Sequence, residues 1–221
     1  MAGPGTGGAD DGAAGRATSD VRIGPEEWAL TWEPTLTDGG APLRATFTRV
    51  TFAGLDLTEL ATHGAVFDRC RFTDVRLSAS EHRESAFLTC TFSGCTFFGA
   101  RFLGCKAVGC TFTRSTFGAL EIERGDWSFV TLARADLTGV TVRGTRMREA
   151  DLTRAVCTGA VLRDVDLSGA ALEDVVLVGA DLRGSDLAAL DPRRAELRGA
   201  VVDLRQAVVL AEGLGVDVRA D

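Results

Sequence analysis

Residues 85–119 read SAFLT CTFSG CTFFG ARFLG CKAVG CTFTR STFGA when the sequence is cut every five residues. Each unit begins with a small residue, and six of the seven units have Phe at the third position. A period of five matches neither the 3.6 residues per turn of an α-helix nor the two-residue alternation of a plain strand. The stretch therefore predicts a repeat architecture.

The same frame extends without a slip over 31 units, whose third positions run from Phe47 to Leu197. These central residues are apolar in 28 units, the exceptions being Thr62, His82 and Pro192, and ten of the twelve Phe residues occupy them. Many units end in Gly, which suits a tight turn with a positive φ. One five-residue unit cannot bury its own centre, so successive coils are expected to stack into a continuous core.

Coils of twenty residues predict columns of central residues twenty positions apart. In one column the smallest member, Ala107, precedes the largest, Trp127, which is the volume compensation that close packing requires. A second column ends at Pro192, which cannot donate to a ladder and marks the last coil on that side. The predicted core contains Phe47, Phe52, Phe67, Phe72, Phe87, Phe92, Phe97, Phe102, Phe112, Phe117, Trp127, Leu137, Leu152 and Leu167.

Two polar centres, Thr62 and His82, lie twenty residues apart and predict a locally irregular side in the first coils. We expect an outward distortion there, in which Glu81 or Glu84 pairs with Arg83 or His82. A catalytic base would need a nucleophile and a pocket, and a filled rod offers no cleft. No P-loop, G-x-S-x-G or H-E-x-x-H motif is present. We therefore expect neither a catalytic site nor a cofactor.

The six cysteines follow the repeat. Their positions are the inward small sites Cys70, Cys90, Cys95, Cys105 and Cys110 and the centre Cys157. No C-x-x-C motif occurs, and parallel stacked side chains are poorly aimed at one another for a disulfide bond. The pattern favours buried thiols that act as small apolar groups over disulfides or a zinc site.

The chain divides into four predicted segments. Residues 1–20 are expected to be a disordered tail, 21–44 a cap in which Pro25 opens a short helix, 45–202 the repeat body, and 203–221 a C-terminal helix and tail. Asp203 is a suitable N-cap for that last helix. Its apolar face is predicted to contain Leu204, Ala207, Val208 and Ala211. This face either caps the open end of the core or is the surface on which two copies meet.

Charge is unevenly distributed. The net charge of −7 argues against a simple nucleic-acid binder, which needs a basic surface. Residues 1–44 carry −4 (7 acids, 3 bases), residues 45–160 carry +2 (12 acids, 14 bases) and residues 161–221 carry −5 (12 acids, 7 bases). The acidic C-terminal coils either face a basic partner or are merely solvated. The candidate partner surface contains Asp164, Asp166, Asp174, Asp181 and Asp186. With neither a signal peptide nor a long apolar run in the sequence, we expect a cytoplasmic protein.

The units ADLTG (135–139), ADLTR (150–154) and ADLRG (180–184) resemble the pentapeptide repeat family. That resemblance implies an all-β fold, a right-handed, four-sided parallel β-helix with one pentapeptide per side. Residues 45–199 correspond to about eight coils, and at the ~4.8 Å strand spacing these form a rod about 40 Å long.

Two less regular stretches carry a narrower resemblance. SEHRESAFLTCTF (80–92) and the ending from Asp191 to Leu214 are similar to the mycobacterial fluoroquinolone-resistance and Qnr-type members of the family. This implies a homodimer joined at its C-termini, with an acidic DNA-like surface that binds DNA gyrase or a related type II topoisomerase and inhibits or protects it. It implies no direct nucleic-acid or membrane binding. Because the middle coils are slightly basic, we confine the expected mimicry to residues from about 161 onward.

An alternative function remains open from the sequence. An outward-facing apolar row predicts a scaffold that binds another protein partner through this side of the rod. The row contains Phe98, Val156, Val176 and Val178.

Overall fold

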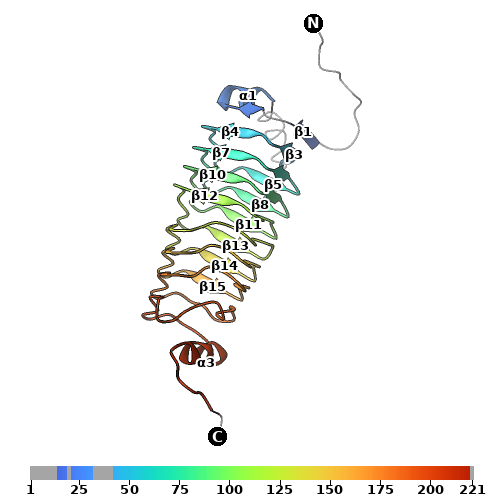
Figure 1. Cartoon of the computed structure of the whole chain (residues 1–221). Helices are drawn as coiled ribbons and strands as arrows, with labels where there is room; N and C mark the ends of the chain where they lie inside the picture. Colours follow the sequence, from blue (N-terminus) through green and yellow to red (C-terminus); the bar gives the residue numbers. More distant parts are fainter. Residues whose placement is uncertain (1–13, 19–20, 32–41, 220–221) are drawn as a thin grey trace.

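The computed structural model describes residues 14–18, 21–31 and 42–219, and over them the chain forms a parallel β-solenoid with a short C-terminal helix (Figure 1). Sheet A contains β1 (Ala14–Thr18), β3 (Arg44–Thr48), β6 (Val66–Asp68) and β9 (Ala86–Leu88). Sheet B contains β2 (Arg22–Ile23), β4 (Thr51–Ala53), β7 (Arg71–Thr73), β10 (Thr91–Ser93) and β12 (Thr111–Thr113). Sheet C contains β5 (Ala61–His63), β8 (Glu81–Arg83), β11 (Arg101–Leu103), β13 (Glu121–Glu123), β14 (Thr141–Arg143) and β15 (Val161–Arg163).

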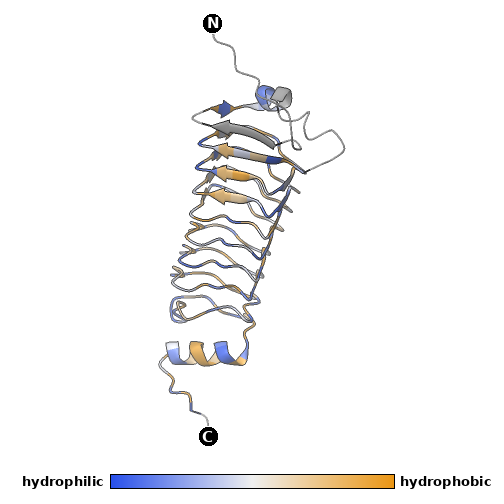
Figure 2. Ribbon diagram, turned by 90° about the vertical axis from the view of Figure 1, so that its right-hand side faces the viewer, coloured by the Kyte–Doolittle hydropathy of each residue, from blue (hydrophilic) through white to orange (hydrophobic). Residues whose placement is uncertain are grey.

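Strands in the repeat body pair in parallel with a register of twenty residues. In sheet B, for example, Phe52 pairs with Phe72, and Phe72 pairs with Phe92. This is the spacing that the repeat predicts. Each coil is therefore twenty residues long and lies directly on the preceding one, as Figure 2 shows from a second side.

The number of regular turns is smaller than predicted. Sheet C has six strands, so about six turns carry strand structure where the repeat length predicts about eight coils. Stacking continues beyond β15 through single bridges, from Val161 to Asp181 and from Asp181 to Val201. The C-terminal coils lack strands because most of each five-residue side there belongs to a tight turn, which leaves one residue per side for pairing.

The corners of the coils lie in the left-handed region. The last residue of the unit has a positive φ in 29 of the 31 units, of which 13 are Gly and 16 are not. Such a conformation is costly for a residue with a side chain. Backbone hydrogen bonds to the next coil offset the cost, as when Arg49 N donates to Asp68 O at 2.8 Å and Arg69 N donates to Leu88 O at 2.8 Å.

All fourteen predicted core residues are buried. The Phe rings of successive coils stack, with centroids 4.6 Å apart between Phe72 and Phe92 and 4.7 Å apart between Phe92 and Phe112. Trp127 takes up the space beside Ala107 and stacks on Phe112 with an interplanar angle of 9°. The predicted volume compensation is confirmed.

The N-terminal end is more ordered than predicted where it is described. β1 pairs in parallel with β3, Ala14 opposite Arg44, so residues 14–18 extend sheet A instead of forming a tail. Backbone pairing needs no apolar pattern, which explains why the composition did not indicate it. The rest of the predicted tail, 1–13 and 19–20, lies outside the described residues. The helix α1 (Pro25–Thr31) follows β2, and the Trp28 ring meets Phe52 edge-on at 6.3 Å.

Candidate interaction surfaces

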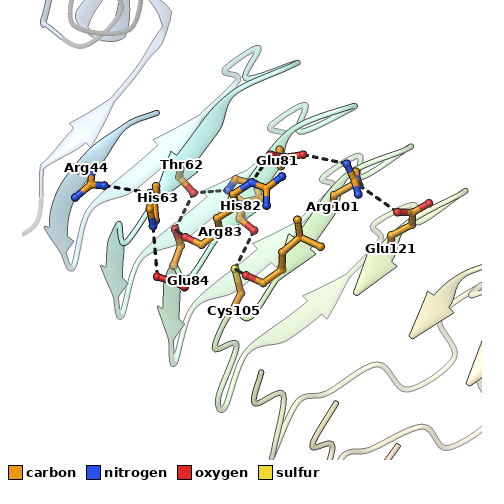
Figure 3. A network of polar contacts seen from close by, with 12 residues as sticks. Arg44, Thr62, His63, Glu81, His82, Arg83, Glu84, Arg101, Cys105 and Glu121 are labelled. Carbon is orange, nitrogen blue, oxygen red and sulfur yellow. Dashed lines mark hydrogen bonds and ion pairs between the residues drawn. The ribbon is translucent and has the colours of Figure 1, made fainter. Parts of the chain in front are cut away.

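The side of the rod that contains Thr62 and His82 is regular, contrary to the predicted distortion. Both side chains are buried, and β5 and β8 pair in register around them. Thr62 Oγ1 lies 2.8 Å from His82 Nδ1 (Figure 3). Ser80 Oγ lies 3.0 Å from His82 Nε2. Because these groups satisfy one another, the polar centres fit inside the rod without turning a strand outward.

The hydrogen bonds also define the state of the His82 ring. Ser80 Oγ donates its proton to Leu77 O at 2.7 Å, so it accepts from Nε2–H of His82, and Nδ1 accepts from Thr62. Burial lowers the pKa of His82 to about 3 and keeps the ring neutral. No substrate could reach this ring. Of the expected ion pairs, Arg83 with Glu81 is present at 2.7 Å, whereas Glu84 lies 3.4 Å from His63 and not beside His82.

The cysteines are buried free thiols, as predicted. Several donate to a carbonyl oxygen 23 residues earlier, for example Cys90 to Phe67 O at 3.2 Å. Burial raises the pKa of Cys95 and of Cys105 to about 11 and that of Cys157 to about 12. Thiols of this kind are packing groups and not nucleophiles.

The predicted acidic residues do not form a single patch. Asp174 forms ion pairs with Arg194 at 3.1 Å and with Arg154 at 3.3 Å, and these two arginines lower its pKa. Asp181 is paired with Arg183 at 2.6 Å, which lowers its pKa to about 2. Both carboxylates point at arginines of their own or neighbouring coils, so they contribute little net field to a partner.

The other three predicted residues gather with a fourth along one edge. Asp166 and Asp186 lie on one side of successive coils, where Ser168 Oγ is 2.5 Å from an oxygen of Asp166 and 3.0 Å from an oxygen of Asp186. Ser168 and then Arg148, whose Nε is 2.6 Å away, lower the pKa of Asp166. We define the acidic edge as Asp164, Asp166, Asp186 and Asp203.

The acidic edge converges on the turn at Gly184. The Asp164 side chain lies over Gly184, and Gly184 N donates to Asp203 Oδ2 at 3.1 Å. Asp164, Asp186 and Asp203 have no arginine or lysine within ion-pair distance among the described residues. Sequence reasoning missed the contribution of Asp203, which it treated only as an N-cap.

The C-terminal helix α3 (Leu204–Gly213) is attached to the last coil by a buried amide. Gln206 and Asp203 form a capping box, in which Asp203 N donates to Gln206 Oε1 at 2.8 Å. The other end of the same amide donates to Leu182 O at 2.6 Å and to Ser185 O at 2.7 Å. Leu210 packs against the core from the same side of the helix. Sequence reasoning missed Gln206 because a polar residue in a helix is ordinarily solvated.

The predicted apolar face of α3 is turned away from the rod. Leu204 is 88% exposed, Ala207 and Val208 are exposed, and Ala211 is half-buried. Of the two uses left open by the sequence, capping the core is therefore wrong for this face. The tail extends the exposed apolar surface through Leu214 and Val216. Figure 2 shows α3 lying across the end of the rod.

On a different side of the rod, five successive middle coils carry almost no charge. The outer residues and turns in 96–99, 116–119, 136–139, 156–159 and 176–179 include one charged side chain, Asp136. Phe98, 63% exposed, lies beside Gly118 of the next coil, and Val156 pairs with Val176. The four residues of the predicted apolar row thus lie on one side.

A model of pentapeptide repeats matches residues 131–169 with eight copies. The chain therefore contains pentapeptide repeats. Over 98 residues it is 38% identical to the pentapeptide repeat protein MfpA of Mycobacterium tuberculosis (strain ATCC 25618 / H37Rv), an alignment that covers 44% of this chain and 54% of MfpA. The match thus spans about half the length of that relative.

Solved structures show the same fold as this protein. Two trypsin-treated forms of QnrB1, a plasmid-mediated fluoroquinolone resistance protein, superpose with TM-scores of 0.65 and 0.64 at 22% and 20% identity. They cover 79% and 94% of this chain and 90% and 100% of the QnrB1 chains. At that identity the likeness concerns the fold alone.

Two further properties bear on what this protein binds. In the described ranges, no group of three or more His, Cys, Asp or Glu side chains is placed to hold a metal ion. The helices described are too short or too polar to cross a membrane.

Proposed function

We propose that this protein is a non-catalytic, cytoplasmic modulator of a type II topoisomerase, with DNA gyrase as the enzyme. It would inhibit gyrase or protect it from fluoroquinolones or a related toxin. The observation that carries the proposal is the acidic edge at the end of a rigid rod, where three of four carboxylates lack a basic partner among the described residues. The resemblance to MfpA and the fold shared with the fluoroquinolone resistance protein QnrB1 support it.

The mechanism follows from electrostatic complementarity. A channel that binds duplex DNA is lined with basic residues, and a narrow rod with carboxylates at regular spacing can occupy it in place of DNA. Preorganisation helps, because the carboxylates are held by the coils and lose little conformational freedom on binding. The middle of the rod is unsuited to this role, since arginines there neutralise the acids, as Arg101 does between Glu81 and Glu121 (Figure 3).

The experiment is a titration of the full-length chain into gyrase supercoiling reactions, with and without ciprofloxacin. The variant Asp164→Asn/Asp166→Asn/Asp186→Asn removes three carboxylates of the acidic edge. A matched variant, Asp68→Asn/Asp74→Asn/Asp136→Asn, removes the same charge from the N-terminal and middle coils. We expect the first variant to weaken inhibition or protection at least about tenfold and the second to change it less than about twofold.

Binding to gyrase is measured in parallel without DNA, at two salt concentrations. The affinity is expected to fall as ionic strength rises, because exposed charges are screened over about 10 Å at 0.1 M salt. Absence of binding, inhibition and protection at micromolar wild-type protein would exclude gyrase as the partner.

Dimerisation through the C-terminal end is part of the proposal. The apolar face of α3, defined by Leu204, Ala207, Val208 and Ala211, is free of the rod and continues into the exposed apolar tail. Two copies that meet on it would bury this surface and place two acidic edges near the centre of a double-length rod. Exposed apolar surface of this kind on a soluble chain commonly marks an interface.

Leu204→Arg and Val208→Arg are each expected to convert a dimer into a monomer of 23.3 kDa, since an unpaired guanidinium would be buried between the copies. Light scattering after size exclusion measures the mass. Thr138→Arg, on the rod, is the control and leaves the mass unchanged. A wild-type mass of 23.3 kDa at micromolar concentration would rule out the dimer, and a dimer retained by both variants would place its interface elsewhere.

A second candidate function is a scaffold that binds a different protein through the charge-poor side. Its support is the single charge in five successive turns and the exposure of Phe98. Phe98→Ser and Val176→Ser would weaken the binding of such a partner and leave gyrase binding unchanged. If these substitutions abolish gyrase binding while the acidic-edge variant does not, the partner surface is this side and not the acidic edge.

A further inference from the structure

The outer surface of sheet B carries two regular rows of hydroxyl groups. In one row Thr51, Arg71, Thr91, Thr111 and Thr131 occupy the same position in successive coils. In the other, Thr73 pairs with Ser93 and Ser93 with Thr113. Neighbouring members are about 4.8 Å apart because that is the strand spacing. The rows form a lattice of hydroxyl groups that Arg71 interrupts once, and Thr113 Oγ1 also donates to Phe92 O at 3.5 Å.

Arginines border this lattice on both sides. Arg49 and Arg69 lie at one corner of the coils, and Arg114 and Arg134 at the opposite corner of the same sheet. We define the hydroxyl–arginine face as Arg22 together with residues 49–54, 69–74, 89–94, 109–114 and 129–134. It carries six arginines and one carboxylate, Asp74.

Five of these six arginines have no carboxylate within ion-pair distance in the described chain, unlike many arginines elsewhere on the rod. All six are exposed, and within the described part of the chain only Arg69 has a carboxylate within reach, Asp68 at 3.9 Å. By contrast, Arg76 and Arg146 form ion pairs with carboxylates twenty residues away, at 2.5 Å and 2.9 Å. Arg114 donates to Ser93 Oγ at 2.8 Å, which leaves the hydroxyl hydrogen of Ser93 free to donate outward. Apart from Asp74, the charged groups of the face are therefore positive, and its hydroxyl groups can donate to or accept from a ligand.

At its N-terminal end the face is hollowed. Arg49, Thr51, Arg69 and Arg71 line a depression of about 210 Å³, with three guanidinium groups and a hydroxyl around it. No carboxylate belongs to this lining. Guanidinium forks match the oxygens of phosphate in geometry as well as charge.

We propose that the hydroxyl–arginine face binds the phosphodiester backbone of a nucleic acid. Arg, Ser and Thr side chains are principal donors to phosphate oxygens. Four coil steps separate Arg49 from residue 129, a length of about 19 Å, which in duplex DNA corresponds to about five or six phosphates of one strand. Contacts to phosphate oxygens carry no sequence information, so we expect binding to be independent of sequence.

The inference departs from the expectation, based on the net charge, of no direct nucleic-acid contact. Net charge sums over surfaces that the fold separates. The acidic edge belongs to the last coils, at 164–166, 186 and 203, whereas the hydroxyl–arginine face belongs to the first coils and a different sheet. A duplex on that face would lie outside a Debye length of the acidic edge over most of its contact. The inference does not depend on the gyrase proposal.

The test is fluorescence anisotropy of a labelled random-sequence duplex of about 30 bp, titrated with the full-length chain from about 25 to 200 mM salt. The face variant is Arg49→Gln/Arg69→Gln/Arg71→Gln. The matched control, Lys106→Gln/Arg124→Gln/Arg143→Gln, removes the same charge from exposed residues off the face that also lack ion pairs in the described chain. We expect the face variant to weaken binding at least about tenfold and to reduce the salt slope by about two to three, and the control to stay within about twofold. Urea unfolding verifies that both variants are as stable as the wild type.

Three results would overturn the inference. The first is no wild-type binding at about 100 µM protein and low salt. The second is an equal loss in the face variant and the control, which would mean diffuse attraction. The third is a labelled poly-glutamate of matched charge that binds the face as tightly as the duplex does, which would mean that the face binds acidic proteins. Gyrase binding measured without DNA separates failure here from failure of the gyrase proposal.

Discussion

Phe92→Ala is expected to lower the free energy of unfolding by ~3–5 kcal/mol, the range found for buried aromatic residues. The Phe92 ring is 2% exposed and stacks between Phe72 and Phe112, with a further edge contact to Phe97 at 5.5 Å. Its removal leaves a cavity between three coils. The coils cannot close this cavity, because backbone ladders hold their spacing. Urea unfolding followed by circular dichroism measures the loss.

Phe98→Ala is the matched control, since Phe98 directly follows the buried centre Phe97 yet points outward. With 63% of its surface exposed, its truncation is expected to change the free energy of unfolding by less than about 0.5 kcal/mol. A loss below about 1 kcal/mol for Phe92→Ala, or equal losses for the two variants, would contradict the stacked column as the main source of stability.

Acidification is expected to destabilise the rod through His82. The pKa of this ring is lowered from 6.5 to about 3 by burial, so between these values the unfolded chain binds a proton that the folded chain does not. His82 therefore costs the folded state nothing above about pH 6.5. Below that pH, the free energy of unfolding falls by ~1.4 kcal/mol per pH unit. At pH 4.5 the loss is about 2.7 kcal/mol.

His82→Phe is the variant that isolates this effect. Phe continues the column toward Phe102, and both hydroxyls keep another partner, Ser80 with Leu77 O and Thr62 with Ser85. Carboxylates act in a lower window: the pKa values of Asp56 and Asp181 are lowered to about 2, so their contribution is lost only as the pH falls below about 4. Urea unfolding between pH 7 and 4.5 is expected to give a steep profile for the wild type and a flatter one for the variant. Parallel profiles would mean that His82 is not the group that titrates.

The interior of this protein was predictable because one sequence period separates inside from outside. The first and third residues of each five-residue unit point inward, so Phe92, Trp127 and the buried thiols could be placed from spacing alone. The same logic failed at Thr62 and His82, where it treated polarity as a sign of distortion. Polar centres fit the core when their partners, here Ser80 and Ser85, come from adjacent small positions.

The surfaces were predictable only in part. The helix α3 and its N-cap Asp203 follow from local signals, but the side that meets the rod does not. The helix is attached through Gln206, whose buried amide donates to two carbonyl oxygens of the last coil, and that contact turns Leu204 and Val208 outward. Apolar periodicity alone could not distinguish a face that caps the core from one left free.

By itself, then, the sequence determined the coil, its twenty-residue register, the identity of the core and the C-terminal helix, because burial of a five-residue repeat has one solution. Only the tertiary structure decided which charges remain unpaired. Asp174 and Asp181 are neutralised by arginines, whereas Asp164 and Asp186 are not. Arg49, Arg69 and Arg71 line one depression, and only Arg69 has a carboxylate within ion-pair distance in the described chain, Asp68 at 3.9 Å. The reason is geometric: outer side chains pair with whatever the next coil places beside them, and the five-residue pattern does not constrain those positions.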